Sequence, residues 1–371
     1  MNKNSERLKA LDVFRGITIA GMVLVNNPGT WSSVYPPLEH SQWNGCTPTD
    51  LIFPFFLFIV GVSITFSLSK RKERGDSHKS LILQIVKRGL ILFALGIFLN
   101  GFPEFNLSTL RIPGVLQRIA IVYVVASFLY LKLNFKGQLI FSLAVLIFYW
   151  GIMTLIPVPG HGQANLEPGT NLSAWLDRFV LGNHIWSQSK TWDPEGILST
   201  LPSIVTAFIG VFTGQLLKNE VSKESKALLM YVAGTFLILG GYLLDFYFPI
   251  NKNLWSSSYV LYTGGLALLF LSTCYWLLDI KNIVKWSKPF EVFGLNAIAL
   301  YFLSQLTAIF LYIITFQSGG ETVTLQDYLF NNLFFTWLGP LNASLLWAVF
   351  YVLFFLGIMW IFYKKKIFIK I

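Results

Sequence analysis

The sequence predicts an all-α fold, a polytopic membrane helix bundle of about ten transmembrane helices, and three observations support this prediction. Charged residues make up 12% of the chain, about half of the roughly 25% that is usual in soluble domains. Hydrophobic residues make up 54%, and the mean hydropathy is +0.60. Apolar runs of about 20 residues, the length that a helix needs to cross a bilayer, recur along the whole chain. They lack the two-residue alternation of a membrane β-barrel.

These runs place ten spans along the 371 residues. No polar block between them is long enough for a separate soluble domain, so we expect a single transmembrane domain over residues 1–371. The spans are expected near residues 11–28, 50–69, 80–99, 111–131, 138–156, 197–217, 227–247, 258–278, 290–315 and 343–363.

Lysine and arginine set the orientation, because cytoplasmic loops of membrane proteins carry an excess of both. With the N-terminus inside, twenty of the 28 Lys and Arg residues lie in inside segments and three lie in outside segments. Both termini are therefore expected to be cytoplasmic. The basic residues are spread over every inside loop, which argues against nucleic-acid binding. The two cysteines fall on opposite sides, so neither an intrachain disulfide nor a cysteine-based metal site is expected.

The first two spans carry clear local signals. The first opens with Leu-Asp-Val-Phe-Arg-Gly, which puts Asp12 and Arg15 three residues apart on one helix face, close enough to pair. It ends at Asn-Asn-Pro-Gly (26–29), where proline and glycine stop the helix. The second span contains Pro54 and Gly61, which indicate a bend or a close helix contact.

The later spans are less distinctive. A long outside loop, 157–196, ends in Asp-Pro-Glu-Gly (193–196), an acidic sequence that suits the N-terminus of the sixth span. The seventh and eighth spans have the composition of ordinary packing helices. The ninth contains Asn296, which suits a hydrogen bond between helices, and the tenth ends in a basic cytoplasmic anchor.

His40 is the strongest candidate for chemistry among the four histidines. It lies in the outside loop before the second span, and Trp43, Asn44 and Asp50 follow within ten residues. Imidazole is the side chain best matched to proton transfer near neutral pH. The alternative is an interfacial histidine that hydrogen-bonds to a loop carbonyl. The amides of Asn44, and of Asn26 at the end of the first span, can donate to a developing oxyanion, or they can simply form turns.

Four cations lie inside apolar runs: Arg15, Lys87, Arg88 and Arg118. Charged residues within a membrane are costly and usually face a cavity, a partner or a ligand. Asp12 can neutralise Arg15, but the other three have no acidic residue nearby in the sequence. The excess of positive charge predicts an anionic, phosphate-rich ligand. The alternative is that the long side chains extend to the membrane surface.

Asp193 and Glu195 form the third candidate group. Acidic side chains with Trp192 beside them suit an amine or a sugar, because an aromatic ring offers a stacking face, and Trp43 offers a second ring. The alternative is a helix cap within an interfacial belt of aromatic residues.

Five blocks together resemble the heparan-α-glucosaminide N-acetyltransferase family, including its bacterial members. They keep their order, and the similarity runs from residue 8 to the end of the chain. The blocks are Leu-Asp-Val-Phe-Arg-Gly (11–16), Val-Asn (25–26), His-Ser-Gln-Trp-Asn-Gly-Cys-Thr-Pro-Thr-Asp-Leu-Ile-Phe-Pro-Phe-Phe-Leu-Phe (40–58), Leu-Arg-Ile-Pro-Gly-Val-Leu-Gln-Arg (110–118) and Trp-Asp-Pro-Glu-Gly-Ile-Leu-Ser-Thr (192–200).

The resemblance implies transfer of an acetyl group from cytoplasmic acetyl-CoA, through the membrane, to the amine of a glucosamine-type sugar on the other side. It aligns His40 with the active-site histidine of the family and Asn26 with an asparagine beside the reaction centre. It implies acetyl-CoA as cosubstrate, no metal, an amino-sugar or glycan acceptor, and a homodimer in some members. Other residues that fall on family motif positions are Asp50, Arg118, Asp193 and Glu195.

Two other functions stay open from the sequence alone. One is an amino-sugar transporter or permease, which would carry the sugar without acetylating it. The other is an O-acyltransferase that acts on a glycan of the cell envelope. In each case we expect an integral membrane protein, located in the inner (cytoplasmic) membrane of a bacterium.

Overall fold

The computed structural model describes residues 8–336 and 338–369. Helices dominate these residues, as the sequence predicts, and the only sheet among them is one two-stranded hairpin. The chain folds as two compact units, and each is described by itself. The first unit holds residues 8–40, 47–52 and 274–369, and the second holds residues 41–46 and 53–273. That the two act as a single domain stays a prediction.

The first unit combines the first helix with the C-terminal third of the chain. Helix α1 (Lys9–Asn26) is followed by two 3₁₀ turns, η1 (Pro36–Leu38) and η2 (Pro48–Leu51). The C-terminal elements of this unit are the π turn η3 (Trp276–Ile280), the 3₁₀ turn η4 (Lys285–Ser287), α10 (Lys288–Leu295), α11 (Ala297–Ile313), β1 (Thr315–Ser318), β2 (Glu321–Thr324), α12 (Leu325–Phe330), the π turn η5 (Asn331–Phe335) and α13 (Pro340–Lys364).

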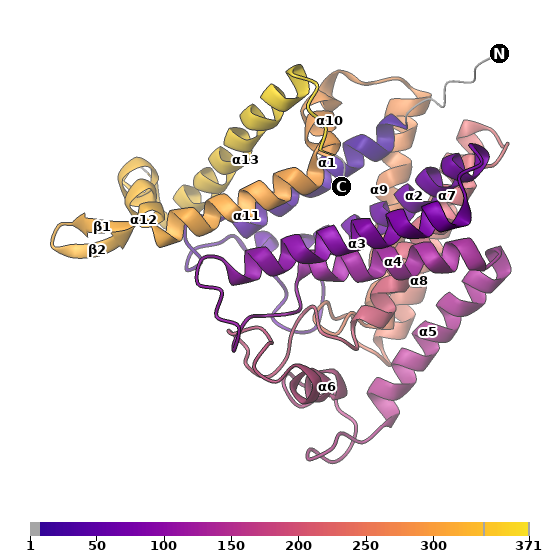
Figure 1. Ribbon diagram of the computed structural model, residues 1–371, viewed down its shortest axis with the longest axis horizontal. Helices are drawn as coiled ribbons and strands as arrows, with labels where there is room; N and C mark the ends of the chain where they lie inside the picture. Colours follow the sequence, from indigo (N-terminus) through magenta and orange to yellow (C-terminus); the bar gives the residue numbers. More distant parts are fainter. Residues whose placement is uncertain (1–7, 337, 370–371) are drawn as a thin grey trace. The chain divides into compact units, whose positions relative to one another are not determined.

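Helices α1 and α10 cross at two glycines (Figure 1). A Cβ atom on Gly16 would lie 1.7 Å from the carbonyl oxygen of Phe290, and one on Gly294 would lie 2.0 Å from that of Asp12. Small residues at such crossings let two backbones approach closely, which is how helices in lipid gain packing energy.

Asn296 lies at the break between α10 and α11, which are bent by 73° and together form the ninth predicted span. Its side-chain Nδ2 donates to the carbonyl of Ile367 (3.0 Å), and its Oδ1 accepts from the N–H of Ile369 (2.8 Å). The buried amide therefore bonds the C-terminal segment, rather than the neighbouring helix that the sequence suggested.

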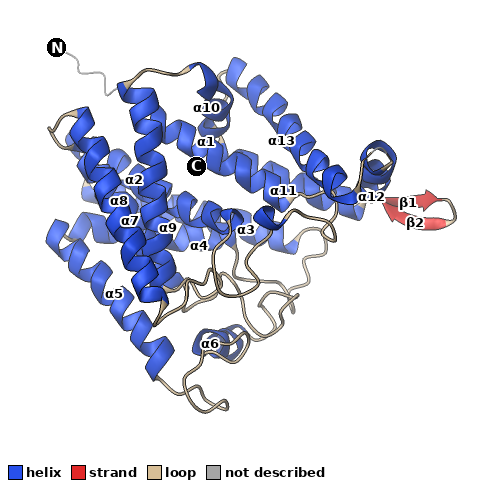
Figure 2. Cartoon of the chain, turned by 180° about the vertical axis from the view of Figure 1, so that it is seen from behind, coloured by secondary structure: helices blue, strands red, loops and turns tan. Residues whose placement is uncertain are grey.

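A β-hairpin follows α11 (Figure 2). Thr315 pairs with Thr324 and Ser318 pairs with Glu321, so the turn contains only Gly319 and Gly320. Both glycines have positive φ, +62° and +87°, which is the conformation that a tight two-residue hairpin turn requires. The sequence analysis assigned this region to a loop, because four-residue strands in an outside loop leave no clear periodic pattern.

The second unit contains the other helices. In Figure 1, α3 and α4 run side by side, and they are among the most extensively packed pairs. The elements are α2 (Ile52–Glu73), α3 (His78–Gly101), α4 (Val115–Lys132), α5 (Phe135–Leu155), α6 (Leu172–Leu181), α7 (Thr200–Lys218), α8 (Lys223–Asp245) and α9 (Ser257–Tyr275), the last of which ends at the boundary with the first unit.

The predicted all-α membrane fold is confirmed. Each of the ten predicted spans coincides with a helix or a bent helix pair. Within the described residues, eight helices are long and apolar enough to cross a membrane, and the bent pair α10–α11 would make a ninth. Helix α1 is not among these eight helices, because its 18 residues include three charged ones, Lys9, Asp12 and Arg15.

Helices α2 and α7 approach closely, as Gly61 in the second span indicated. A Cβ atom on Gly61 would lie 1.8 Å from the carbonyl oxygen of Ala207, and one on Gly210 would lie 2.0 Å from that of Phe58. Helix α7 has a small or polar residue at almost every turn, and most of its side chains are buried.

We predict that Gly210→Ala destabilises the protein, because the added methyl group must push the α2 backbone away. Overpacking of this kind typically costs about 1–3 kcal/mol, and thermal unfolding in detergent or nanodiscs measures the loss. Gly151→Ala in α5 is the matched control, since a Cβ there meets no atom within 4 Å. Equal unfolding temperatures for the two variants would contradict the close α2–α7 crossing.

Candidate functional site

His40 and Asp50 form a hydrogen-bonded pair in the first unit. The His40 Nδ1 atom lies 2.7 Å from Oδ1 of Asp50. The aspartate side chain is fully buried, whereas the histidine side chain is half exposed. An ionised carboxylate can only accept, so Nδ1 carries the proton and Nε2 carries the ring lone pair. The pair thus orients an imidazole toward solvent in the tautomer that a general base or nucleophile needs.

The position of Asp50 is fixed by the turn that contains it. Thr47 and Asp50 form a capping box around η2, with Pro48 in the first helical position. The second carboxylate oxygen, Oδ2, lies 3.0 Å from both the backbone nitrogen and the hydroxyl of Thr47. The Thr47 hydroxyl also lies 2.6 Å from the carbonyl of Glu39, next to His40. The local sequence Thr-Pro-Thr-Asp therefore holds the carboxylate in place independently of its contact with the imidazole.

The two asparagines at the end of α1 differ in their hydrogen bonds. Asn27 is buried, and its Nδ2 donates to the carbonyl of Val23 (2.8 Å). The side chain of Asn26 is half buried and makes no hydrogen bond within the described residues. Asn27 is thus a helix-terminating residue, while no described residue accepts a hydrogen bond from the two N–H donors of the Asn26 amide.

Asn44 and Trp43 belong to the second unit. The Asn44 Oδ1 accepts from the amide of Asn251 (3.1 Å), which supports a structural role in joining this loop to the segment after α8. The Trp43 indole N–H donates to the carbonyl of Leu166 (2.9 Å). Its ring meets that of Trp192 edge to face, with 5.2 Å between centroids, and Trp192 contacts Trp186 in the same way at 5.7 Å. The structure therefore brings Trp43 and Trp192 together.

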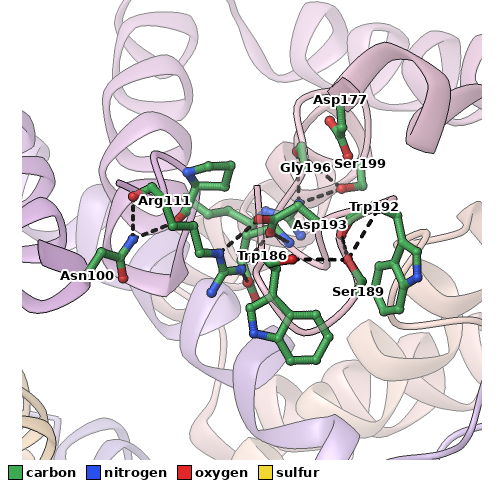
Figure 3. Close-up of polar contacts among 12 residues, drawn as sticks. Asn100, Arg111, Asp177, Trp186, Ser189, Trp192, Asp193, Gly196 and Ser199 are labelled. Atoms are coloured by element: carbon green, nitrogen blue, oxygen red, sulfur yellow. Dashed lines mark hydrogen bonds and ion pairs between the residues drawn. The ribbon is translucent and has the colours of Figure 1, made fainter. Parts of the chain in front are cut away.

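The acidic residues Asp193 and Glu195 are held by Arg111 (Figure 3). The guanidinium donates to both oxygens of Asp193, from Nε at 2.9 Å and from Nη2 at 2.6 Å, and Nη2 also lies 2.6 Å from Oε2 of Glu195. Burial alone would lower the pKa of Arg111, but the two carboxylates outweigh it and raise that pKa. Both carboxylates of this ion cluster are therefore paired with a guanidinium of the protein, in place of the open acidic pair that the sequence predicted.

Two further side chains hold the loop that carries Arg111. The Asn100 amide donates to the carbonyls of Arg111 and Pro113, both at 2.8 Å. The His184 Nδ1 atom lies 2.8 Å from the carbonyl of Leu110, and the His184 carbonyl accepts from the N–H of Ile112 (3.0 Å). His184 is therefore part of the framework around the ion cluster.

Arg118 lies deeper, beneath the turn that follows the acidic residues. It is 1% exposed, and its Nη2 donates to the carbonyl of Gly196 (3.0 Å) and to the Ser199 hydroxyl. Its guanidinium carbon lies 5.1 Å from the ring centroid of Trp255. Nε and Nη1 have no hydrogen-bond partner among the described residues. Trp255 itself has φ of +51°, a costly conformation for a bulky residue, so this buried cation rests on a strained backbone.

Asp177 of α6 is a buried carboxyl that the sequence analysis missed. It is 1% exposed, and its Oδ1 accepts from the N–H of Ile197 (2.8 Å). Gly196 permits this approach, since a Cβ there would lie 2.1 Å from Oδ2. Burial, and to a smaller extent the charge of Asp193, raise the pKa of Asp177 to about 6, against the lowering effects of the Ile197 N–H and Arg118.

The contacts of the other predicted cations are with residues outside this cluster. In the first unit, Arg15 pairs with Asp12 (3.2 Å), as predicted, and also donates to the carbonyl of Gly294 (3.3 Å). In the second unit, Arg88 stacks on Tyr123 of α4, 4.8 Å from the ring centroid, and its buried Nε has no partner within the described part of the chain. Lys87 is exposed.

The face of α3 that carries Lys87 is mostly apolar, although it also contains the exposed Gln84. It includes Leu83, Leu90 and Ile91, all of which are exposed, and these positions lie three or four residues from Lys87 along the helix. This placement favours the alternative in which the lysine extends to the membrane surface.

Arg111 and Asp177 show what sequence reasoning missed. Arg111 was seen only as a residue at the end of a span, although the acidic Asp-Pro-Glu sequence in a loop on the same predicted side was a possible signal. Asp177 sits among Leu, Trp, Phe and Val in a segment assigned to a loop, where its burial left no pattern. Among the described residues, no group of three or more His, Cys, Asp or Glu side chains is arranged to hold a metal.

We predict that Asp177→Asn changes the pH dependence of stability. The folded-state pKa of about 6 lies above the ordinary value of 3.8, so the folded chain holds the extra proton between these values. Stability from this group is complete below about pH 4 and is lost as pH rises through about 6. The variant keeps an acceptor for Ile197 but cannot ionise. At pH 7.5 it should therefore be more stable than the parent protein by about 3 kcal/mol, and at pH 4 equally stable.

Thermal unfolding from pH 4 to pH 8 tests this prediction. Glu167→Gln, which removes the same charge from an exposed position, corrects for the change in net charge. A difference between the Asp177→Asn variant and the parent that stays constant with pH would contradict the raised pKa.

Comparison with known proteins assigns the family. A family model described as heparan-alpha-glucosaminide N-acetyltransferase, catalytic, matches residues 7–251. The mouse (Mus musculus) heparan-alpha-glucosaminide N-acetyltransferase is 31% identical over 99% of this chain, and the human (Homo sapiens) protein is 31% identical over 98%. The chain spans 61% and 60% of the length of these two curated relatives. The chain belongs to the heparan-alpha-glucosaminide N-acetyltransferase family.

Proposed function

We propose that this chain is a transmembrane acetyltransferase. In the proposal it moves acetyl from acetyl-CoA on the cytoplasmic side to the amine of a glucosamine-type sugar on the extracytoplasmic side of a bacterial inner membrane. The observation that carries the proposal is the His40–Asp50 hydrogen bond of 2.7 Å in a chain whose relatives are N-acetyltransferases. A buried carboxylate that orients a half-exposed imidazole supports acyl transfer, whereas sugar transport alone requires no such pair.

The proposed step uses three residues of the first unit. The neutral amine of the sugar attacks the thioester carbonyl carbon, so a C–N bond forms and the C–S bond breaks. Nε2 of His40 takes the proton that the nitrogen loses and returns it to the departing thiolate, which gives the amide and the coenzyme thiol. Asp50 stabilises the transient imidazolium through Nδ1–H. The Asn26 amide, which has no hydrogen bond among the described residues, supplies a donor to the carbonyl oxygen.

A second route uses the same residues. Nε2 attacks the thioester first, and the acetyl group then passes from the imidazole to the amine. Acid quenching after mixing the protein with radiolabelled acetyl-CoA, without acceptor, distinguishes the routes, because only this second route leaves label on the protein.

The other predicted residues take supporting parts in the proposal. Of the four cations predicted to bind acetyl-CoA, Lys87 is exposed on α3, and Arg118 donates to the 196–199 turn while its Nε and Nη1 have no partner among the described residues. Arg15, Arg88 and Arg118 each remain a candidate for contact with a phosphate of acetyl-CoA. Trp43 and Trp192 offer the stacking face for the sugar. Asp193 and Glu195 bind Arg111 and in this way support the loop that carries Trp192. The hydrogen bond of Asn44 to Asn251 favours a structural role for Asn44.

Proteoliposomes test the sidedness. Acetyl-CoA is supplied on the side of the predicted cytoplasmic loops and glucosamine on the other side. N-acetylglucosamine is expected to form on the glucosamine side. Uptake of unmodified sugar, or acetylation only when both reactants are on one side, would refute the proposal in favour of a transporter or a one-sided enzyme.

Variants of the imidazole pair test the chemistry. We expect His40→Ala and Asp50→Asn each to lower kcat by about 10²- to 10⁴-fold, the latter because an amide donor in place of the carboxylate favours the wrong imidazole tautomer. His161→Ala, at an exposed histidine of the long outer loop, serves as control and should keep full activity. Folded His40→Ala protein with normal turnover would remove the imidazole from the mechanism.

A further inference from the structure

Helix α6 (Leu172–Leu181) is amphipathic in the opposite sense to an ordinary surface helix. Its buried face consists of Ser173, Ala174 and Asp177. Its most exposed side chains are Phe179 and Val180, at 75% and 56%. In a soluble protein the apolar face of a surface helix turns inward. Here Ser173 and Asp177 turn inward together with Ala174 and the partly buried Leu172, while the most exposed side chains are apolar.

The charged residues of α6 are committed to the protein. Asp177 bonds the Ile197 N–H, as described above. The Arg178 guanidinium donates to the carbonyls of Gly169 and Thr191. The outward face is left with aromatic and aliphatic groups, and the rings of Trp175 and Phe179 stack in parallel, with an interplanar angle of 7° and 5.3 Å between centroids.

The apolar face of α6 continues a surface that faces lipid. Helix α5, one of the helices apolar enough to cross a membrane, contacts α6 within the second unit. Its exposed side chains include Ile147 and Leu155, and the exposed Ile156 follows directly after its last residue. In Figures 1 and 2, α6 is seen end-on beside the C-terminal end of α5, while α5 runs across the view.

We infer that α6 is an interfacial helix that rests on the outer leaflet, with Phe179 and Val180 in contact with phospholipid. Ten residues extend about 15 Å, too short to span the bilayer but suited to lie along its surface. Trp, here Trp175, is enriched at membrane–water interfaces. The opposite face holds Asp177 under the 193–197 turn, so the bilayer and the ion cluster of Arg111 contact the same short helix.

Spin-label accessibility tests this inference without any enzymatic activity. The chain has only two cysteines, Cys46 and Cys274, which are replaced by Ser and Ala. A nitroxide on Val180→Cys is measured in phosphatidylcholine and phosphatidylglycerol liposomes, against oxygen, which partitions into lipid, and a water-soluble nickel chelate. Leu143→Cys, on the exposed apolar face of α5, is the lipid control, and His161→Cys, in an exposed turn, is the water control.

The expected ratio of oxygen to nickel accessibility at position 180 is close to that at position 143 and several-fold higher than that at position 161. A ratio like that of position 161 would overturn the inference. So would spin–spin broadening that disappears on dilution with unlabelled protein, which would indicate a second copy on this face, or a label shielded from both reagents, which would indicate a protein contact.

A second variant separates lipid contact from misfolding. Phe179→Asp should fold, because the side chain is largely exposed, but a charge disfavours insertion into lipid. The label at position 180 should then shift toward the water control, while the label at position 143 stays unchanged. An unshifted label at position 180 in this folded variant would contradict the inference.

Discussion

The cost of a buried carboxylate governs the arrangement of this protein. Removing the partner of a buried ion lowers the stability of the fold by about 3–5 kcal/mol. Each buried carboxylate therefore needs hydrogen-bond donors, and the loops around it must supply them. Asp50 is matched by His40 and the Thr47 turn. Asp193 and Glu195 are matched by Arg111. Loops are usually the more mobile parts of a protein. In the loops that carry these residues, the paired charges provide specific contacts that restrict the backbone.

Asp177 is the exception, because its buried Oδ2 has no hydrogen-bond partner among the described residues. Around the 193–199 turn, the positive charges of Arg111 and Arg118 balance those of Asp193 and Glu195. An ionised Asp177 adds a third carboxylate charge to this site, and the attraction of Arg118 offsets it only in part. Burial, with a smaller contribution from the charge of Asp193, raises the pKa of Asp177 to about 6, so this carboxyl is protonated below that pH and ionised above it.

The sequence was sufficient for features that depend on long or local patterns. Apolar runs of about 20 residues predicted every span, and the His40–Asp50 pair could be suspected because its members are ten residues apart. It was insufficient where the partner lies far along the chain. Arg111 and Asp193 are 82 positions apart in the sequence, and the residues around each do not identify the other as its partner. The same holds for α6, whose inward polar face inverts the pattern by which surface helices are normally recognised.

The family motifs gain a physical meaning from these contacts. The blocks 110–118 and 192–200 are far apart in the sequence, yet they form one structure, because Arg111 binds the acidic residues and Arg118 binds Gly196 and Ser199. The block 40–58 likewise contains both members of the imidazole pair. In each case the arginine or carboxylate is buried and has a specific partner, so a change on one side would leave an unpaired charge on the other. The two members of each pair are therefore coupled, and we expect a substitution of one to require a compensating substitution of the other.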